Sequence, residues 1–269
     1  MKNNFGIDAN DRSAQIKSWL CKTPATDWLE DFCSLGVITF PCELLDFGCG
    51  NGKYDALLSQ IGVKVTGIDR ETNCIYEAKK NNPAYAQIIN GDISELCHFQ
   101  NYFDVILIRY VLHLIEKNNR QSFISMLQSG LKPGGYLVIE TSFFEQYKNH
   151  YDHIIFPKLT ENNRLIYPEL DEIQQLLYME GFDDVECKRT IQQKPYILSI
   201  DQAIDQSDKL VCEGQGQTAW LRLSKDERVQ FHAKRKKELI HLFPSGEIPQ
   251  IWEGTFIKAK KQKPLFEKF

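Results

Sequence analysis

The sequence predicts an α/β fold in which a largely parallel sheet has helices on both faces. From about residue 40 onward, strand-like and helix-like stretches alternate, and this alternation is typical of parallel strands joined by crossover helices. The strand-like stretches are short and apolar, as expected for strands buried on both faces. With 269 residues, of which 42% are hydrophobic and 25% charged, the chain can bury a sizeable core, which excludes a mostly disordered or fibrous protein.

Seven stretches have the composition of strands, and the first five are expected to pair in parallel. They are Leu44–Phe47, Val63–Ile68, Ala86–Ile89, Val105–Ile108, Tyr136–Ile139, Asp184–Cys187 and Gly254–Ala259. The fifth follows Lys132-Pro133-Gly134-Gly135, a turn expected to stop the preceding helix.

The predicted crossover helices have apolar residues at helical spacing. They are Tyr54–Gln60, Cys74–Lys80, Arg120–Gln128 and Pro168–Glu180. About sixty residues separate the last two strands, far more than an ordinary connection. Within them, Ile200–Val211 and Lys225–Leu242 have helical spacing, which predicts a helical insertion. We therefore expect an N-terminal helical cap over 1–40, a sheet domain over 41–192 and 254–269, and the insertion over 193–253.

Charge and cysteine usage restrict the possible partners. The 32 basic and 36 acidic residues give a net charge of −4, so no overall positive field favours nucleic acid or an anionic membrane. The first twenty residues do not resemble a signal peptide, and no apolar run is long enough to span a membrane. The eight cysteines form no Cys-x-x-Cys pair. We expect a soluble cytoplasmic protein with reduced thiols and no metal site.

A glycine-rich turn follows the first predicted strand, within Leu44–Gly52. Such a turn lets the backbone approach a ligand closely and directs amide donors toward it. A dinucleotide fingerprint would need glycine at position 53, where the chain has Lys53. A Walker loop would need serine or threonine after that lysine, and Tyr54 stands there. What remains is an Asp-x-Gly-x-Gly-x-Gly pattern, formed by Asp46, Gly48, Gly50 and Gly52.

This pattern resembles the class I S-adenosylmethionine-dependent methyltransferases. Further parts of the family pattern follow in order: Asp69 closing the second strand, Asp92 after the third, the segment Phe103–His113, and the Lys132–Gly135 turn. The last strands fit as well, so the resemblance covers most of the chain. It implies a Rossmann-like, seven-stranded methyltransferase sheet. The N-terminal segment and the insertion resemble the cap of small-molecule members, particularly the branch that includes trans-aconitate methyltransferase.

The resemblance implies S-adenosylmethionine as cofactor and gives roles to the matching residues. The glycines would wrap its methionyl part, with Asp46 fixing the loop or accepting from the ammonium group. Asp69 would bind the ribose hydroxyls, and Asp92 the adenine amino group, beside the Ile93 amide. The residues expected at the cofactor are Asp46, Gly48, Cys49, Gly50, Gly52, Asp69, Arg70, Asp92, Ile93 and Arg109.

Simpler structural explanations stay open for these residues. The glycines would also suit a plain strand–helix turn, Asp69 a helix N-cap and Asp92 a turn. Arg109 would face the cofactor through its carbonyl while its side chain points elsewhere.

His113 is the candidate for acid–base chemistry, because neutral imidazole is a natural base near neutral pH. A histidine between Leu112 and Leu114 also suits a packed, noncatalytic position. Tyr110, Tyr151 and Trp220 are expected to wall a substrate cavity, with core packing as the alternative for the last two. The basic run Lys234–Lys237 is expected to be a solvated face.

The expected reaction is in-line displacement at the sulfonium methyl by an oxygen, nitrogen or carboxylate of a small molecule, with the insertion as a lid. The sequence Arg109–Leu112 lacks the Asn/Asp-Pro-Pro-aromatic motif of enzymes that methylate exocyclic amino groups of nucleic-acid bases, and it also has no Pro-Cys nucleophile. Two alternatives remain: an RNA or protein methyltransferase that uses Lys234–Lys237, and a noncatalytic cofactor-binding partner protein. The identity of the acceptor is not readable from the sequence.

Overall fold

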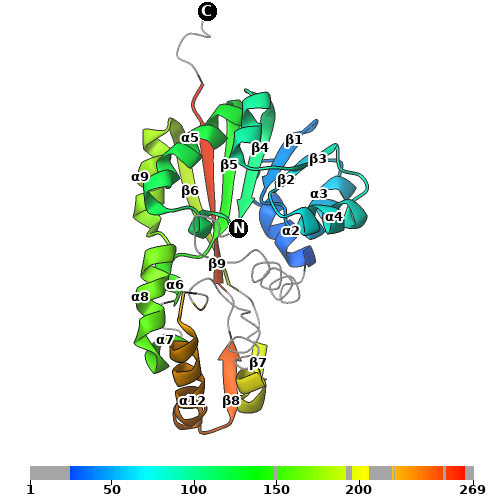
Figure 1. Cartoon of the computed structure of the whole chain (residues 1–269). Coiled ribbons are helices and arrows are strands. Elements are labelled where there is room, and N and C mark those ends of the chain that lie inside the picture. Colours follow the sequence, from blue (N-terminus) through cyan, green and yellow to red (C-terminus); the bar gives the residue numbers. More distant parts are fainter. Residues whose placement is uncertain are drawn as a thin grey trace, which may run out of the picture. The chain divides into compact units, whose positions relative to one another are not determined.

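A computed structural model describes residues 25–147, 151–191, 196–205, 220, 222–250 and 253–263. The chain divides into two compact units (Figure 1). The sheet unit contains the described residues of Leu20–Thr141, Leu170–Arg189 and Thr255–Phe269. The helical unit contains those of Ser142–Glu169 and Thr190–Gly254.

The sheet unit is built on a seven-stranded sheet of order β3-β2-β1-β4-β5-β9-β6. The strands are β1 Glu43–Phe47, β2 Lys64–Asp69, β3 Gln87–Asn90, β4 Phe103–Arg109, β5 Leu131–Thr141, β6 Phe182–Ile191 and β9 Glu253–Lys261. The pairs from β3 to β5 are parallel, and β9 runs antiparallel to β5. The predicted sheet, its seven strands and the parallel pairing of the first five are confirmed.

Helices cover both sides of this sheet (Figure 1). They are α2 Ala25–Cys33, α3 Lys53–Gln60, α4 Thr72–Asn81, α5 Arg120–Gly130 and α9 Leu170–Met179, with 3₁₀ turns η1 Ile93–His98, η2 Leu112–Leu114 and η3 Lys117–Asn119. Leu44, Val65, Val105 and Val138, from four strands, are fully buried in one hydrophobic cluster. Phe32 brings α2 into this cluster, so the first described helix is part of the sheet unit's core.

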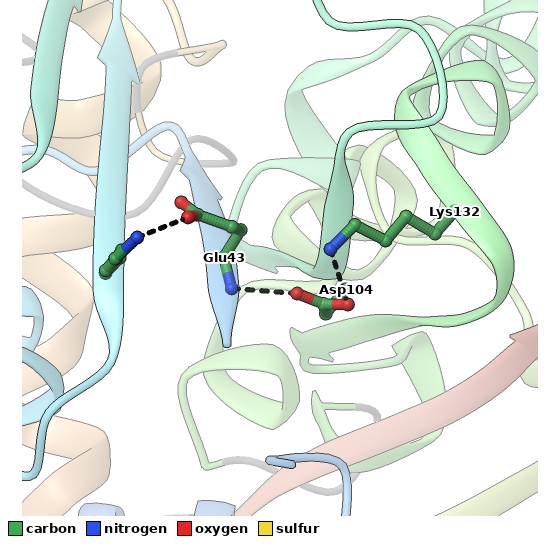
Figure 2. A network of polar contacts seen from close by, with 4 residues as sticks. Glu43, Asp104 and Lys132 are labelled. Carbon is green, nitrogen blue, oxygen red and sulfur yellow. Dashed lines mark hydrogen bonds and ion pairs between the residues drawn. The ribbon is translucent and has the colours of Figure 1, made fainter. Parts of the chain in front are cut away.

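The turn predicted at Lys132–Gly135 lies inside strand β5 instead. A register shift between Phe103 and Val105 allows β5 to begin early, at Leu131. Figure 2 shows the polar contacts beside this irregularity. Asp104 accepts hydrogen bonds from Lys132 Nζ at 2.8 Å and from the Glu43 backbone N–H at 2.9 Å. These contacts join β1, β4 and β5 at the amino ends of the parallel strands.

The helical unit consists of short helices and a two-stranded antiparallel sheet. Its elements are α6 Phe144–Tyr147, α7 Tyr151–Ile155, α8 Pro157–Ile166, a helical segment over 200–205, α12 Lys225–Leu242, and strands β7 Tyr196–Ser199 and β8 Glu247–Gln250. The predicted helix Lys225–Leu242 is confirmed, and Ser224 and Glu227 form a capping box at its start. The strand pair β7–β8 was not predicted and adds to the helices expected in the insertion.

The observed division of the chain differs from the expected domain boundaries. Residues 142–169 group with 190–254, whereas the sequence analysis assigned them to the sheet domain, and α2 belongs to the sheet unit rather than to a separate cap. Residues 1–24 and 206–211 of the predicted helical segments lie outside the described residues. No helix in the described part of the chain combines the length and apolar character needed to cross a membrane.

Candidate functional site

The glycine loop, Gly48–Gly52, connects β1 to α3 at the carboxyl end of the parallel strands. Its three glycines adopt left-handed backbone conformations, with φ of 81°, 56° and 68° at Gly48, Gly50 and Gly52. A Cβ on Gly48 would lie 2.4 Å from Val111 Cγ2, so a larger residue does not fit. Cys49 is buried, and its Sγ packs against the backbone of Gly67. The pattern predicted from the sequence therefore forms a tight, left-handed turn.

Asp69, at the end of β2, holds the glycine loop in place. Its carboxylate accepts hydrogen bonds from the backbone N–H groups of Gly50 and Glu71, each at 2.9 Å. Burial raises the pKa of Asp69, and these hydrogen bonds oppose the rise. The N-cap residue of α4 is Glu71, so Asp69 does not occupy the N-cap position considered as its alternative. Each carboxylate oxygen can accept a second donor, so the group is still able to bind a diol.

Asp92 caps the 3₁₀ turn that begins at Ile93. Its Oδ1 accepts from Ser94 N at 2.8 Å and from Ser94 Oγ at 2.6 Å, and these bonds lower the pKa of Asp92. The carboxyl group is exposed. Gly91 N donates to Asp69 O at 3.1 Å, so the structure brings the two predicted aspartate segments together. The alternative of a purely structural turn residue explains the contacts of Asp92 Oδ1 only. Its role toward adenine stays a prediction.

The Arg109 side chain lies in a buried cluster of aromatic and acidic groups. It forms an ion pair with Glu140, and its guanidinium carbon lies 3.5 Å from the ring centre of Tyr54 and 4.6 Å from that of Trp28. Trp28 Nε1 donates to Glu140 Oε2 at 2.8 Å. The side chain therefore has structural partners at the ends of β4 and β5. The sequence analysis did not identify Trp28 or Glu140, which lie far from Arg109 in the chain.

The segment after β4 crosses the glycine loop. Tyr110 has a left-handed backbone, with φ of 52°, and its N–H donates to Glu140 O at 2.8 Å. Such a conformation in a residue with a Cβ costs about 1–3 kcal/mol and is common at functional sites. Val111 follows and contacts Gly48. The predicted substrate residue Tyr110 is thus next to Val111, the residue that contacts the glycine loop.

Arg70, which was expected at the cofactor, is exposed and forms an ion pair with Glu71.

His113 lies in η2 and is buried, with 5% of its surface exposed. Burial, together with the positive charge of Arg120, lowers its pKa to about 3. The imidazole is therefore neutral near neutral pH, as a general base must be, although so low a pKa makes it a weak base. Its role as a base stays a prediction.

Asp46 forms a buried acidic pair that the sequence analysis missed. Its side chain interacts with that of Asp55, in the first turn of α3, and the Tyr85 hydroxyl donates to Asp55. Asp46 and Asp55 are 2% and 0% exposed. Acidic residues in a first helical turn are common because they favour the helix dipole, so the sequence offers no signal that Asp55 is buried.

Tyr151 and Trp220 belong to the helical unit, where both pack against its apolar cluster. Trp220 is 4.2 Å from Phe231 between ring centres, and Tyr151 is 5.6 Å from Phe243. The core-packing alternative thus describes their observed contacts. In the basic run, Lys234, Lys236 and Lys237 are exposed. Arg235 corrects the expected solvated face, because it is buried and paired with Asp152 at 2.9 Å.

The resemblance to the class I S-adenosylmethionine-dependent methyltransferases implied a Rossmann-like seven-stranded sheet, a glycine-rich turn after the first strand and an aspartate closing the second strand. The structure has all three features. Residues 45–139 match the family described as methyltransferase domain. This match spans about a third of the chain, so residues 45–139 are similar to a methyltransferase domain.

Similar proteins agree with this assignment. An uncharacterized methyltransferase of Synechocystis is 33% identical over 93 residues, which are 35% of this chain and 43% of the relative. A malonyl-[acyl-carrier protein] O-methyltransferase of Buchnera aphidicola is 33% identical over 102 residues, 38% of this chain and 40% of the relative. The chain thus spans less than half of these two relatives. The crystal structure of a putative methyltransferase from Bacillus halodurans has the same fold, with a TM-score of 0.57 and 15% sequence identity. The match covers 87% of this chain and 99% of that chain.

Proposed function

We propose that the protein transfers the methyl group of S-adenosylmethionine to an oxygen, nitrogen or carboxylate of a small molecule. The observation that most supports this function is the glycine loop, whose three left-handed glycines are fixed to Asp69 through the Gly50 amide. Such a loop leaves room for a ligand to lie directly on backbone. A methyltransferase domain match over the same residues supports the assignment of that ligand.

The residues present suit this cofactor. The left-handed glycines leave the backbone of the loop without side chains that would shield it from a ligand, and the remaining lone pairs of the Asp69 carboxylate suit ribose hydroxyls. We assign the methionyl part to the glycine loop and Asp46, and the adenine to Asp92 and the Ile93 amide. The bound cofactor supplies an activated methyl group on positive sulfur. The protein's part is to align the acceptor with that methyl and to exclude water.

The acceptor is proposed only by class. Relatives include the Buchnera enzyme named above and a demethylmenaquinone methyltransferase of Tropheryma whipplei, 27% identical over 167 residues, 59% of this chain and 66% of the relative. Their names refer to acceptors of different chemistry, which supports methyl transfer without selecting one acceptor. We further propose that the helical unit covers the acceptor as a lid, and that the likeness to the trans-aconitate methyltransferase branch extends to this role.

The test of cofactor binding is the Asp69→Ala substitution. Removing the carboxylate loses the ribose acceptor and releases the Gly50 amide, so we expect at least a tenfold loss of affinity for S-adenosylmethionine, equivalent to about 1.4 kcal/mol. Isothermal titration calorimetry measures the affinity of the wild type and of the variant for S-adenosylmethionine. Asp104→Ala is the matched control, because Asp104 also accepts a backbone N–H but lies at the amino ends of the strands (Figure 2). Unchanged affinity in Asp69→Ala, or an equal loss in both variants, would contradict the assignment.

A second experiment separates the alternative functions. The protein is incubated with methyl-labelled cofactor and cell extract, and small molecules are then separated from macromolecules. Label in the small-molecule fraction supports the proposal. Label in RNA or protein supports the alternative that uses the exposed Lys234, Lys236 and Lys237, and RNA retention would then fall as salt rises. Tight cofactor binding without any labelled product would indicate a noncatalytic binding protein.

A further inference from the structure

The Asp46–Asp55 pair flanks the glycine loop in the chain. Asp46 is two residues before Gly48, and Asp55 is three residues after Gly52. The Tyr85 hydroxyl binds Asp55 and would lie 2.5 Å from a Cβ on Gly52. Two carboxyl groups and a phenol therefore lie next to the loop.

This arrangement favours one proton shared between the two carboxyl groups. Both are almost completely inaccessible to solvent, and their side chains interact. Two carboxylates would bury two like charges side by side, whereas a carboxylic acid and a carboxylate bury only one and can share the proton in a hydrogen bond. In the described part of the chain, no N–H or O–H reaches Oδ1 of either residue. A shared proton accounts for these two buried oxygens.

The groups around this pair act on its proton in opposite directions. Burial raises the pKa of both carboxyl groups, and their interaction raises that of Asp46 further. Arg109, from β4, acts in the opposite direction on both, but its charge is largely balanced by the ion pair with Glu140 of β5. Asp69 of β2 adds another negative charge, and the buried Cys49 thiol is also near Asp46.

A ligand with positive charge would change this balance. A cation near a carboxyl group favours the ionised form, and the effect is largest where water is excluded. Under the proposed function, the ligand at the loop has a sulfonium, an ammonium and a carboxylate before the reaction, and so one net positive charge. After methyl transfer it is a thioether that keeps the ammonium and the carboxylate, without net charge.

We propose that the Asp46–Asp55 pair holds one proton in the free protein and releases it when the sulfonium cofactor binds, and so distinguishes cofactor from product. This inference rests on the proposed function. The O–H bond of the protonated carboxyl breaks, its electron pair stays on oxygen, and the proton goes to the solvent. Both carboxyl groups would then be ionised while the sulfonium ligand is bound. When the product forms, one positive charge is lost and the pair takes up a proton again.

The proton release is measured by calorimetry of the full-length protein in two buffers with different ionisation enthalpies, at one pH near neutral. We expect the wild type to release up to one proton on binding S-adenosylmethionine and fewer on binding S-adenosylhomocysteine. The affinity for S-adenosylmethionine should then rise by up to about tenfold per pH unit, and the affinity for the product should rise less.

Asp55→Asn supplies the variant test, because asparagine keeps the shape and can donate to Asp46 without a titrating proton. We expect this variant to bind the cofactor without releasing a proton. Asp104→Asn, at the other end of the strands, should release as many protons as the wild type. Equal proton release for cofactor and product in the wild type, or none for either, would overturn the inference, and this result needs no variant to fold. If no binding is seen at all, the proposed function fails instead.

Discussion

At the scale of single residues, the burial of His113 predicts how stability depends on pH. Its pKa is lowered to about 3 in the folded protein, from an ordinary value of 6.5. Between these values the unfolded chain binds a proton that the folded chain does not, so the free energy of unfolding falls as the pH falls through this window. At pH 5 the loss from this residue reaches about 2 kcal/mol.

We expect His113→Gln to lose less stability than the wild type when the pH is lowered from 7.5 to about 5. Urea denaturation at the two pH values measures the difference. His98, which is exposed, is the control, and His98→Gln should follow the wild-type curve. If His113→Gln also follows that curve, the imidazole does not stay neutral in the folded state.

For single residues, the sequence predicts backbone conformation that depends on neighbouring residues, but not contacts between distant segments. The left-handed turn of Gly48, Gly50 and Gly52 was predictable because only glycine tolerates such a backbone together with close contact. The partners of the Arg109 side chain were not predictable, because Trp28 and Glu140 come from distant segments that only the folded sheet brings together. The burial of Asp55 likewise depends on Tyr85, thirty residues away.

At the scale of elements, the Trp28–Glu140 hydrogen bond attaches α2 to the end of β5. Removing the indole N–H in Trp28→Phe loses a hydrogen bond to a charged group, which is worth roughly 1.5–3 kcal/mol. We expect the free energy of unfolding to fall by about this amount, as measured by urea denaturation. A double-mutant cycle with Glu140→Gln isolates the contact. Strictly additive losses would show that the hydrogen bond does not stabilise α2.

Elements were predictable where their periodicity was long and repeated. The bounds of the 18-residue helix α12 were predicted to the residue from its apolar spacing. The structure adds a capping box at its start. The strands β7 and β8 were not predicted. Each has four residues, their partners are about fifty residues apart in the chain, and β8 contains Pro249, which argues against a strand.

For the whole molecule, the division into two units predicts that one can be destabilised without the other. The Arg235 guanidinium is buried. It donates to Asp152 at 2.9 Å and to Ala203 O at 2.8 Å. Asp152→Asn removes the compensating charge, and breaking such a pair typically costs about 3–5 kcal/mol. We expect faster hydrogen exchange across the helical unit only.

The same variant tests the proposed lid. Affinity for the cofactor should be retained by the sheet unit, while methyl transfer should be lost. Asp152→Leu combined with Arg235→Met is the matched control, because replacing both charges with apolar groups leaves no unpaired ion. This double variant should regain protection from exchange. Faster exchange across the sheet unit in Asp152→Asn would contradict the division.

The order of the sheet has a consequence for protein synthesis. Strand β9 lies between β5 and β6, although it is the last of the seven to leave the ribosome. Until residues 253–261 have been translated, β6 has no neighbour and the hydrogen-bonding edge of β5 is open, which is a known route to aggregation. A nascent chain that stalls before β9 is therefore a natural substrate for chaperones.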